Sequence, residues 1–315
     1  MNWQSRTTTL PVFKKQKGIL RGTDMKKRLT SILIAIMFIA GLGMLAYPTI
    51  ANQWNSYTQS RAITSYEQNV EELKPEDFTK EWDTAKKFND ALEENDPFTD
   101  VFGSVYLDMK ESEYWKVLNV AGNGIMGYIS IPSINVELAI YHGTEESVLQ
   151  TGIGHVNGTK LPIGGEGNHT VLAGHRGLPS ARLFTDIDQL VRGDKIYIHI
   201  LDEVLAYEVD QILDMVDKDD TDTLNKAMTI EEGEDYITLF TCTPYGVNSH
   251  RLLVRGSRIE YGGEEELDQT ITETMVEAVQ NYYMIYLILG LAVLLLGIVI
   301  LKFLINRKNK RTHNS

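Results

Sequence analysis

The sequence is poor in cysteine: Cys242 is the only one in 315 residues, so an intramolecular disulfide is excluded. A single free cysteine is most often a small buried apolar residue. The sequence also lacks internal repeats and long low-complexity tracts, which argues against a repeat protein. It has no dense acidic cluster with metal-ligand spacing, since the acidic stretch at 214–224 is typical of a solvated loop. We therefore expect no metal and no other cofactor.

Charge is nearly absent from two long apolar runs, residues 29–47 and 283–305, the second of which contains only Lys302, near its end. A membrane-spanning helix needs about 17–25 residues, and both runs reach that length. Basic residues precede the first run and follow the second. The positive-inside rule then predicts a two-pass protein of the cell membrane, with both termini in the cytoplasm and residues 48–282 outside.

The first run leaves two alternatives open. A cleaved signal peptide would also be apolar, although Ala46-Tyr47-Pro48 is a poor cleavage site, so an uncleaved anchor is favoured. The polar residues 1–24 form a cytoplasmic tail if translation starts at Met1, and are absent from the protein if it starts at Met25.

Acidic residues are scarce in the terminal segments and abundant between them. Residues 1–28 and 302–315 together hold 13 of the 30 basic residues and one of the 43 acidic ones. The remaining segment, 29–301, therefore holds 17 basic and 42 acidic residues, a net charge of −25. Such a charge argues against a nucleic-acid partner and suits a soluble domain at a cell surface.

The segment between the membrane runs changes pattern along its length. Apolar residues recur at helical spacing over 48–94, where Pro75 begins a second helix. Beyond a turn-rich break, at least six short alternating runs rich in Val, Ile, Leu and Tyr predict a closed β-barrel or a sandwich, with one short helix at 179–190. The predicted order is a tail (1–28), a membrane helix (29–47), a helical region (48–94), the break (95–103), the β-rich domain (104–262), an acidic linker (263–282), a membrane helix (283–305) and a tail (306–315).

Outside the membrane a lone thiol risks oxidation, which favours a chemical role for Cys242 over simple burial. A nucleophilic cysteine needs a nearby base or cation to form the thiolate. His175 lies between Gly174 and Gly177 where a β-run ends, a position from which a ring can enter a cleft, although a surface histidine is the simpler interpretation. The other histidines stand in ordinary strand, loop or cytoplasmic contexts: His142, His155, His169, His199, His250 and His313.

The third candidate is an arginine. The runs TLFTC and RLLVRG are joined by eight residues and predict a hairpin, in which Arg251 begins the second strand. There its guanidinium can lie beside the Cys242 sulfur and stabilise an oxyanion. Arg255 and Arg258 are the competitors for this role. Arg255 shares the face of Arg251 but lies about 13 Å further along the strand, at ~3.3 Å per residue.

The segment TLFTCTPYGVNSHRLLVRG resembles the active-site segment of the sortases, and HTVLAGHRGLPSARLFTDIDQLVRGDKIYI resembles their histidine segment. Both are similar to class C, the pilin-polymerising sortases, and the likeness extends over roughly residues 50–305. It implies a mainly β fold: a closed eight-stranded sortase-type barrel with N-terminal helices and a lid, flanked by two transmembrane helices. It further implies that Cys242 is the nucleophile, His175 the general acid and base, and Arg251 the residue that positions the substrate and supports the oxyanion.

The resemblance also gives a role to the break at 95–103, since class C enzymes carry an Asp-Pro-aromatic motif in a lid. Here the motif would be Asp96, Pro97 and Phe98, with Asp96 paired to Arg251 and Phe98 covering Cys242. An exposed pair of this kind is worth about 0–1 kcal/mol, which suits a lid that must open. An ordinary Asp-Pro turn between helix and barrel is the alternative.

The function implied by the resemblance is transpeptidation. Cys242 would cleave an LPxTG-like sorting signal of a pilin or surface protein between Thr and Gly, and a pilin lysine would resolve the thioester. Three alternatives remain: a sortase that attaches proteins to cell-wall peptide, a hydrolytic cysteine protease, and a non-catalytic surface binding domain in which Cys242, His175 and Arg251 need not converge.

Overall fold

The structure is a computed structural model that describes residues 16–92, 102, 112–263 and short stretches between 285 and 302. The chain divides into two compact units, residues 1–46 with 282–315 and residues 47–281. The second unit contains the strands and every described candidate for chemistry.

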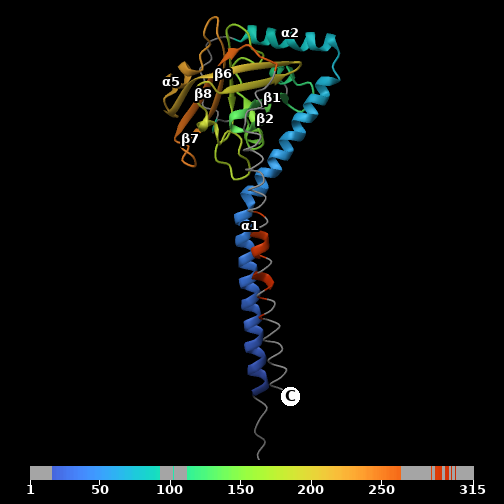
Figure 1. The fold of residues 1–315 in the computed structure, drawn as a ribbon, viewed down its shortest axis with the longest axis vertical. Helices are drawn as coiled ribbons and strands as arrows, with labels where there is room; N and C mark the ends of the chain where they lie inside the picture. Colours follow the sequence, from blue (N-terminus) through green and yellow to red (C-terminus); the bar gives the residue numbers. More distant parts are fainter. Residues whose placement is uncertain are drawn as a thin grey trace, which may run out of the picture. The chain divides into compact units, whose positions relative to one another are not determined.

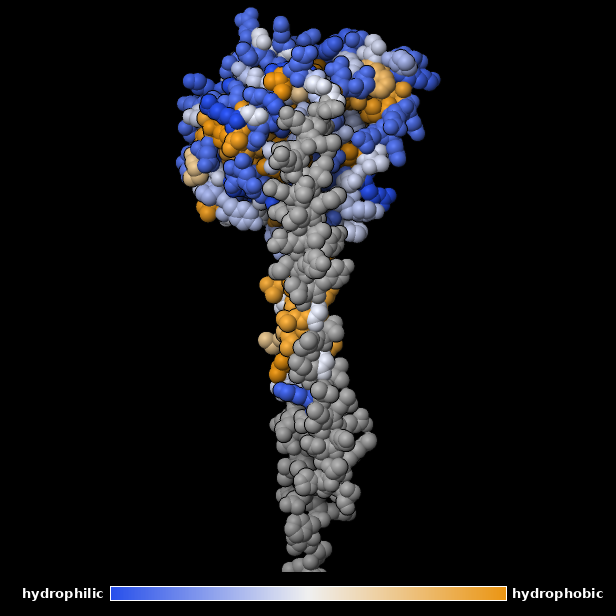
Figure 2. Space-filling view, in the orientation of Figure 1, coloured by the Kyte–Doolittle hydropathy of each residue, from blue (hydrophilic) through white to orange (hydrophobic). Residues whose placement is uncertain are grey.

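The first helix is longer than its sequence pattern suggested. Helix α1 runs from Gln16 to Glu71 without a break at residue 47, and it contains Pro48. Within the described part of the chain, one helix segment, Leu29–Glu71, is long and apolar enough to cross a membrane. Most apolar side chains in the first part of this segment, between Leu29 and Ile50, are exposed, as the orange surface on the helix shows (Figure 2). Most of the second predicted run, 283–305, lies outside the described residues.

Polar side chains fasten the last turns of α1 to the strands. The Tyr66 hydroxyl donates to the Met126 carbonyl at 3.1 Å and accepts from the Leu201 amide at 2.8 Å. Gln59 accepts from the Ala139 amide at 2.9 Å.

Helix α2 (Pro75–Ala91) begins at Pro75, as predicted. Proline is suited to this position because the amide of a first helical residue has no partner within the helix, and proline has no amide hydrogen.

Eight strands form a closed barrel in the order β1-β2-β3-β4-β7-β8-β6-β5, which confirms the predicted fold (Figure 1). Two neighbouring pairs, β2 with β3 and β4 with β7, are parallel, and the other pairs are antiparallel. The strands are β1 (Ile125–Ile131), β2 (Val136–His142), β3 (Ile153–His155), β4 (Asn168–Ala173), β5 (Lys195–Ile200), β6 (Glu203–Asp217), β7 (Asp235–Thr243) and β8 (His250–Ile259). The short helices are α3 (Glu113–Lys116), η1 (Pro132–Ile134), α4 (Glu146–Leu149), η2 (Ile187–Gln189) and α5 (Thr221–Ala227).

Both faces of β7 are buried, and the burial includes three threonines, Thr238, Thr241 and Thr243. Side chains alternate between the faces of a strand. Ile237 and Leu239 belong to the large cluster inside the barrel, whereas Phe240 belongs to a second cluster on the other face. This second cluster, here called the outer cluster, also contains residues of β4, β8, α4 and α5: Ala173, Leu253, Leu149 and Leu224.

The predicted helix at 179–190 is wrong. Only Ile187–Gln189 form a short helical turn, of the 3-10 type. Leu183 has φ of 40°, which breaks any helix, and the Phe184 amide donates to the His175 carbonyl at 3.2 Å. This segment instead folds back on the end of β4 because Phe184, Ile187 and Leu190 must reach the barrel core.

Candidate active site

The outer cluster ends in polar residues where β4 and β7 finish. On β7, Cys242 follows Phe240 on the same face, since side chains alternate with period two. Cys242 is in no disulfide, and 6% of its surface is exposed. The sulfur therefore lies at the edge of the barrel wall, behind an apolar layer.

His175 reaches the same edge from β4. Ala173 pairs with Phe240 in the parallel register of β4 and β7. The chain stays beside β7 for two more residues, because the Gly174 amide donates to the Phe240 carbonyl at 3.1 Å and the Thr241 hydroxyl donates to the Gly174 carbonyl at 2.7 Å. His175 and Cys242 thus occupy corresponding positions, each two residues beyond an apolar partner.

Arg251 completes the edge from the other side of β7. It is the register partner of Cys242 in the antiparallel hairpin of β7 and β8, and Leu253 of the outer cluster follows it on the same face. Its side chain is 3% exposed, and Nη1 donates to the carbonyls of Asn248 (3.0 Å) and His250 (2.9 Å). These bonds fix the guanidinium at the end of the strand.

The competing arginines serve the barrel wall. Arg255 donates to both carboxylate oxygens of Asp210 and lies 4.0 Å from the centre of the Tyr236 ring. Arg258 lies 3.8 Å from the Asp235 carboxylate and faces the Tyr207 ring. Both are therefore explained by ion pairs within the fold.

One aromatic residue of the predicted lid covers this edge. The Phe102 ring lies 5.6 Å from the His175 ring and 5.4 Å from the stacked ring of Phe240, between ring centres. The Arg251 guanidinium lies 5.4 Å from the centre of the same ring, within cation–π range. Cys242's two predicted partners therefore share one aromatic neighbour.

Asp96, Pro97 and Phe98, the predicted lid motif, lie outside the described residues. We expected both members of an Asp96–Arg251 pair to be exposed. The structure shows instead that Arg251 is buried in the barrel wall. A carboxylate that met Arg251 there would be partly desolvated, and the estimate for surface pairs would not apply.

Sequence reasoning missed two neighbours of His175. Phe102 lay inside the predicted lid segment, and its aromatic character was the available signal. Glu146 of α4 places Oε2 3.4 Å from His175 Nε2, although 29 residues separate them. No local pattern marks Glu146, because α4 meets β4 only through tertiary packing.

A further contact ties the histidine loop to the end of β7. Arg176 donates from Nη1 to the Thr243 hydroxyl at 3.1 Å, and its Nη2 pairs with Asp188. Gly177 has φ of +83°, a conformation that glycine adopts without strain, and a Cβ atom there would come within 3.1 Å of the Tyr245 ring. The loop is thus held against the residues that directly follow Cys242.

Three other histidines of the barrel, His142, His155 and His169, form hydrogen bonds within the barrel wall. His155 is fully buried, with Nδ1 2.9 Å from the Tyr114 hydroxyl and Nε2 2.9 Å from the Lys160 carbonyl. Burial lowers its pKa to about 4. Burial likewise lowers the pKa of His142 and of His169. These rings are neutral structural groups at neutral pH.

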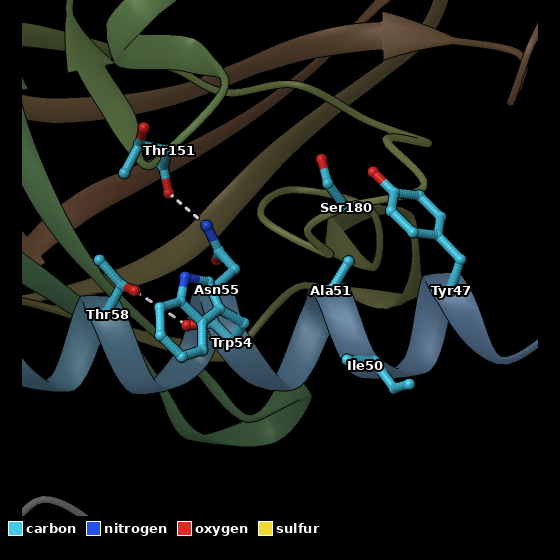
Figure 3. A pocket seen from close by; sticks show the side chains of 8 residues that line it. All are labelled: Tyr47, Ile50, Ala51, Trp54, Asn55, Thr58, Thr151 and Ser180. Carbon is cyan, nitrogen blue, oxygen red and sulfur yellow. Dashed lines mark hydrogen bonds between the residues drawn. The ribbon is translucent and has the colours of Figure 1, made fainter. Parts of the chain in front are cut away.

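A separate pocket of about 510 Å³ lies between α1 and the loops at Thr151 and Ser180 (Figure 3). Tyr47 and Trp54 line it from the helix, and the Asn55 amide donates to the Thr151 carbonyl at 2.9 Å. Its lining does not include Cys242, His175 or Arg251, so it is distinct from the edge described above.

Comparison with known proteins gives concordant matches. The family model of the sortase domain matches residues 129–259. Sortase A of Bacillus anthracis is 28% identical over 235 residues, which cover 74% of this chain and 96% of that protein. Among solved structures, sortase C of Streptococcus pneumoniae is 42% identical with a TM-score of 0.55, over 65% of this chain and 100% of that one. Sortase C1 of Streptococcus agalactiae is 45% identical with a TM-score of 0.56, over 64% and 99% of the two chains.

Proposed function

Because this chain belongs to the sortase family and is a cysteine transpeptidase, we propose that it polymerises pilins by acyl transfer from an LPxTG-like sorting signal to a pilin lysine. The observation that carries this proposal is the meeting of Cys242, His175 and Arg251 at one edge of the barrel. The class C structural neighbours support it, and the pneumococcal one is described with a pilin substrate specificity.

In the first step, the Cys242 thiolate attacks the carbonyl carbon between Thr and Gly of the signal. The C–N bond breaks, the departing glycine amine takes a proton from His175, and the protein remains joined to Sγ as a thioester. In the second step a lysine amine attacks the thioester and loses a proton to His175. The C–S bond then breaks, and the thiolate is restored.

Arg251 would hold the reacting carbonyl in both steps. Its guanidinium is fixed by two backbone carbonyls, so it needs little reorganisation when negative charge develops on the carbonyl oxygen. A fixed donor at that point lowers the energy of the tetrahedral intermediate more than that of the bound substrate.

The segment 95–103 would act as the lid. Phe102 supports this role because its ring covers His175 and Arg251, so a substrate must displace it to reach both side chains. Asp96, Pro97 and Phe98 complete the proposed lid by the sequence motif.

The membrane arrangement forms part of the proposal. The exposed apolar surface of α1 supports an anchor at 29–47, and the flanking basic residues support a second pass at 283–305 with both termini cytoplasmic. The barrel would then face the outer surface, where pilins are assembled. An epitope tag after Ser315 that antibodies reach on intact cells would contradict this topology.

The test is intact-mass spectrometry of the full-length chain in detergent micelles with an LPxTG peptide. We expect a mass increase equal to the peptide up to Thr, absent from Cys242→Ala, and faster adduct formation in Phe102→Ala and in the double variant of Asp96 and Phe98. Adding a pilin lysine peptide should discharge the adduct. Discharge only by a cell-wall peptide amine would favour the anchoring sortase, discharge only by water would favour a protease, and no adduct with any related peptide would refute transpeptidation at Cys242.

A further inference from the structure

Helix α4 brings one carboxylate to the catalytic histidine. Leu149 packs in the outer cluster with Ala173 and Phe240, which anchors α4 against β4 and β7 near His175 and Cys242. Three residues earlier, Glu146 Oε2 lies 3.4 Å from His175 Nε2. The side chains of Glu146 and His175 are 67% and 19% exposed, so the contact lies at the rim of the site.

The carboxylate is held in place by a second partner. Gln150, one turn later, donates from Nε2 to Glu146 Oε1, which leaves Oε2 directed at the imidazole. The pKa of Glu146 is lowered, first by the hydrogen bond from Gln150 and then by His175. Glu146 is therefore an anion with a defined orientation at neutral pH.

The imidazole is restrained from two sides. Phe102 packs against the ring, and Glu146 faces its Nε2. The nearby cations point elsewhere: Arg176 is turned toward Thr243 and Asp188, and Arg251 lies across Phe102. Glu146 is thus a charged side chain in direct contact with the His175 ring.

We propose that Glu146 is a positioning residue for acyl transfer: it orients the His175 imidazole and stabilises its protonated form, which donates the proton to the departing amine. The carboxylate stays ionised throughout and takes no proton itself, so the proton moves only between His175 and the two amines. This role rests on the proposed function of His175.

Glu145 offers a matched control. It carries the same charge one residue away, but its carboxylate accepts from the Ser147 hydroxyl at 3.4 Å instead of facing His175. Glu145→Gln and Glu146→Gln change the net charge equally. Only the second removes the anion beside the imidazole.

The experiment compares full-length wild type, Glu146→Gln, Glu146→Asp and Glu145→Gln in transfer from an LPxTG peptide to an amine, between pH 5 and 9. We expect Glu146→Gln to lower kcat by about threefold to fivefold, the size for a partly exposed ion pair, with KM unchanged. The alkaline limb of its pH profile should move to lower pH by about half a unit. Glu146→Asp should recover part of kcat, and Glu145→Gln should match wild type.

Gln150→Leu distinguishes the orientation of the Glu146 carboxylate from its charge. It removes the hydrogen bond that orients the carboxylate but leaves the negative charge in place. It should lower kcat less than Glu146→Gln does, without moving the alkaline limb. Circular dichroism on each variant checks that the fold is retained. Equal effects of Glu145→Gln and Glu146→Gln, or an unchanged pH profile in Glu146→Gln, would overturn the assignment while wild-type acyl-enzyme still formed. Absence of acyl-enzyme in wild type would instead overturn the proposed function, and the role of Glu146 with it.

Discussion

The outer face of β4, β7 and β8 carries a histidine and an arginine at each of its two ends, but the two pairs have different interaction partners. At one end, here called the closed end, His169 and Arg255 stand beside Thr238. At the other, the catalytic end, His175 and Arg251 stand beside Cys242. Apolar residues fill the face between them. Strand periodicity alone produces this arrangement, since equivalent side chains recur every second residue.

The difference lies in the partners. At the closed end, the His169 ring nitrogens lie 2.9 Å from the Thr229 carbonyl and 2.8 Å from the Thr238 hydroxyl, and Arg255 is paired with Asp210. At the catalytic end, His175 meets a mostly exposed carboxylate and Arg251 lies under an aromatic ring of the proposed lid. Short internal bonds make the first histidine and arginine structural. In the second pair, His175 has its charged partner Glu146 at the rim, and Arg251 faces the Phe102 ring, which a substrate must displace.

The largest expected effect is at the catalytic end. Arg251→Lys keeps the positive charge but loses the planar fork that can hold a carbonyl oxygen. We expect the rate of acyl-enzyme formation to fall by about 100-fold to 1,000-fold, as for loss of an oxyanion donor. Arg255→Lys is the matched control and should stay within about twofold of wild type. A similar loss in both variants would erase the distinction between the two ends.

The next largest effect is a pH dependence of the free energy of unfolding, caused by a histidine in the barrel wall. The pKa of His155 is about 4 in the folded state, below the value of about 6.5 for an unfolded chain. The unfolded state therefore binds more protons between pH 6.5 and 4, and stability falls as the pH drops through this window. We expect the free energy of unfolding to decrease by about 3 kcal/mol from this residue. Denaturant titrations at several pH values measure it, and a flat profile below pH 6.5 would contradict it.

A smaller effect is expected from removing the ion pair at the closed end. Arg255→Met keeps the stem on Tyr236 but leaves Asp210 without its guanidinium. Because both side chains are partly exposed, we expect a loss of about 1–2 kcal/mol in stability, between the values for surface and buried pairs. Thermal unfolding checks this, and activity at 25 °C should be retained. A loss of activity without a loss of stability would place Arg255 in the catalytic machinery after all.

The barrel was largely predictable because its strands alternate or are continuously apolar, and the hairpin of Cys242 and Arg251 followed from two such runs. Strand β3 was missed because three residues, Ile153–His155, are too few to show a period. The helix at 179–190 was wrong because burial of Phe184 and the left-handed Leu183 outweigh helical spacing. Tertiary packing overrides local preference at such points.

Within the candidate site, the sequence motifs indicated the residues at the strand ends but not those that approach from other elements. Glu146 comes to His175 on a four-residue helix whose position depends on Leu149 in the outer cluster. Phe102 lies four residues beyond Phe98, and no spacing rule distinguishes the two aromatic residues. Contacts of this kind arise from the closed fold and have no local signature.

The parallel pairing of β4 with β7 also sets the moment at which the thiol becomes reactive. Strands β5 and β6 and helix α5 lie between the two in the chain, so a polypeptide synthesised from its N-terminus contains His175 well before Cys242 is added. Closing so long a loop costs entropy that only the completed sheet repays. The cysteine therefore meets its imidazole as one of the last events of barrel assembly, and until β7 pairs with β4 the thiol stands apart from its base.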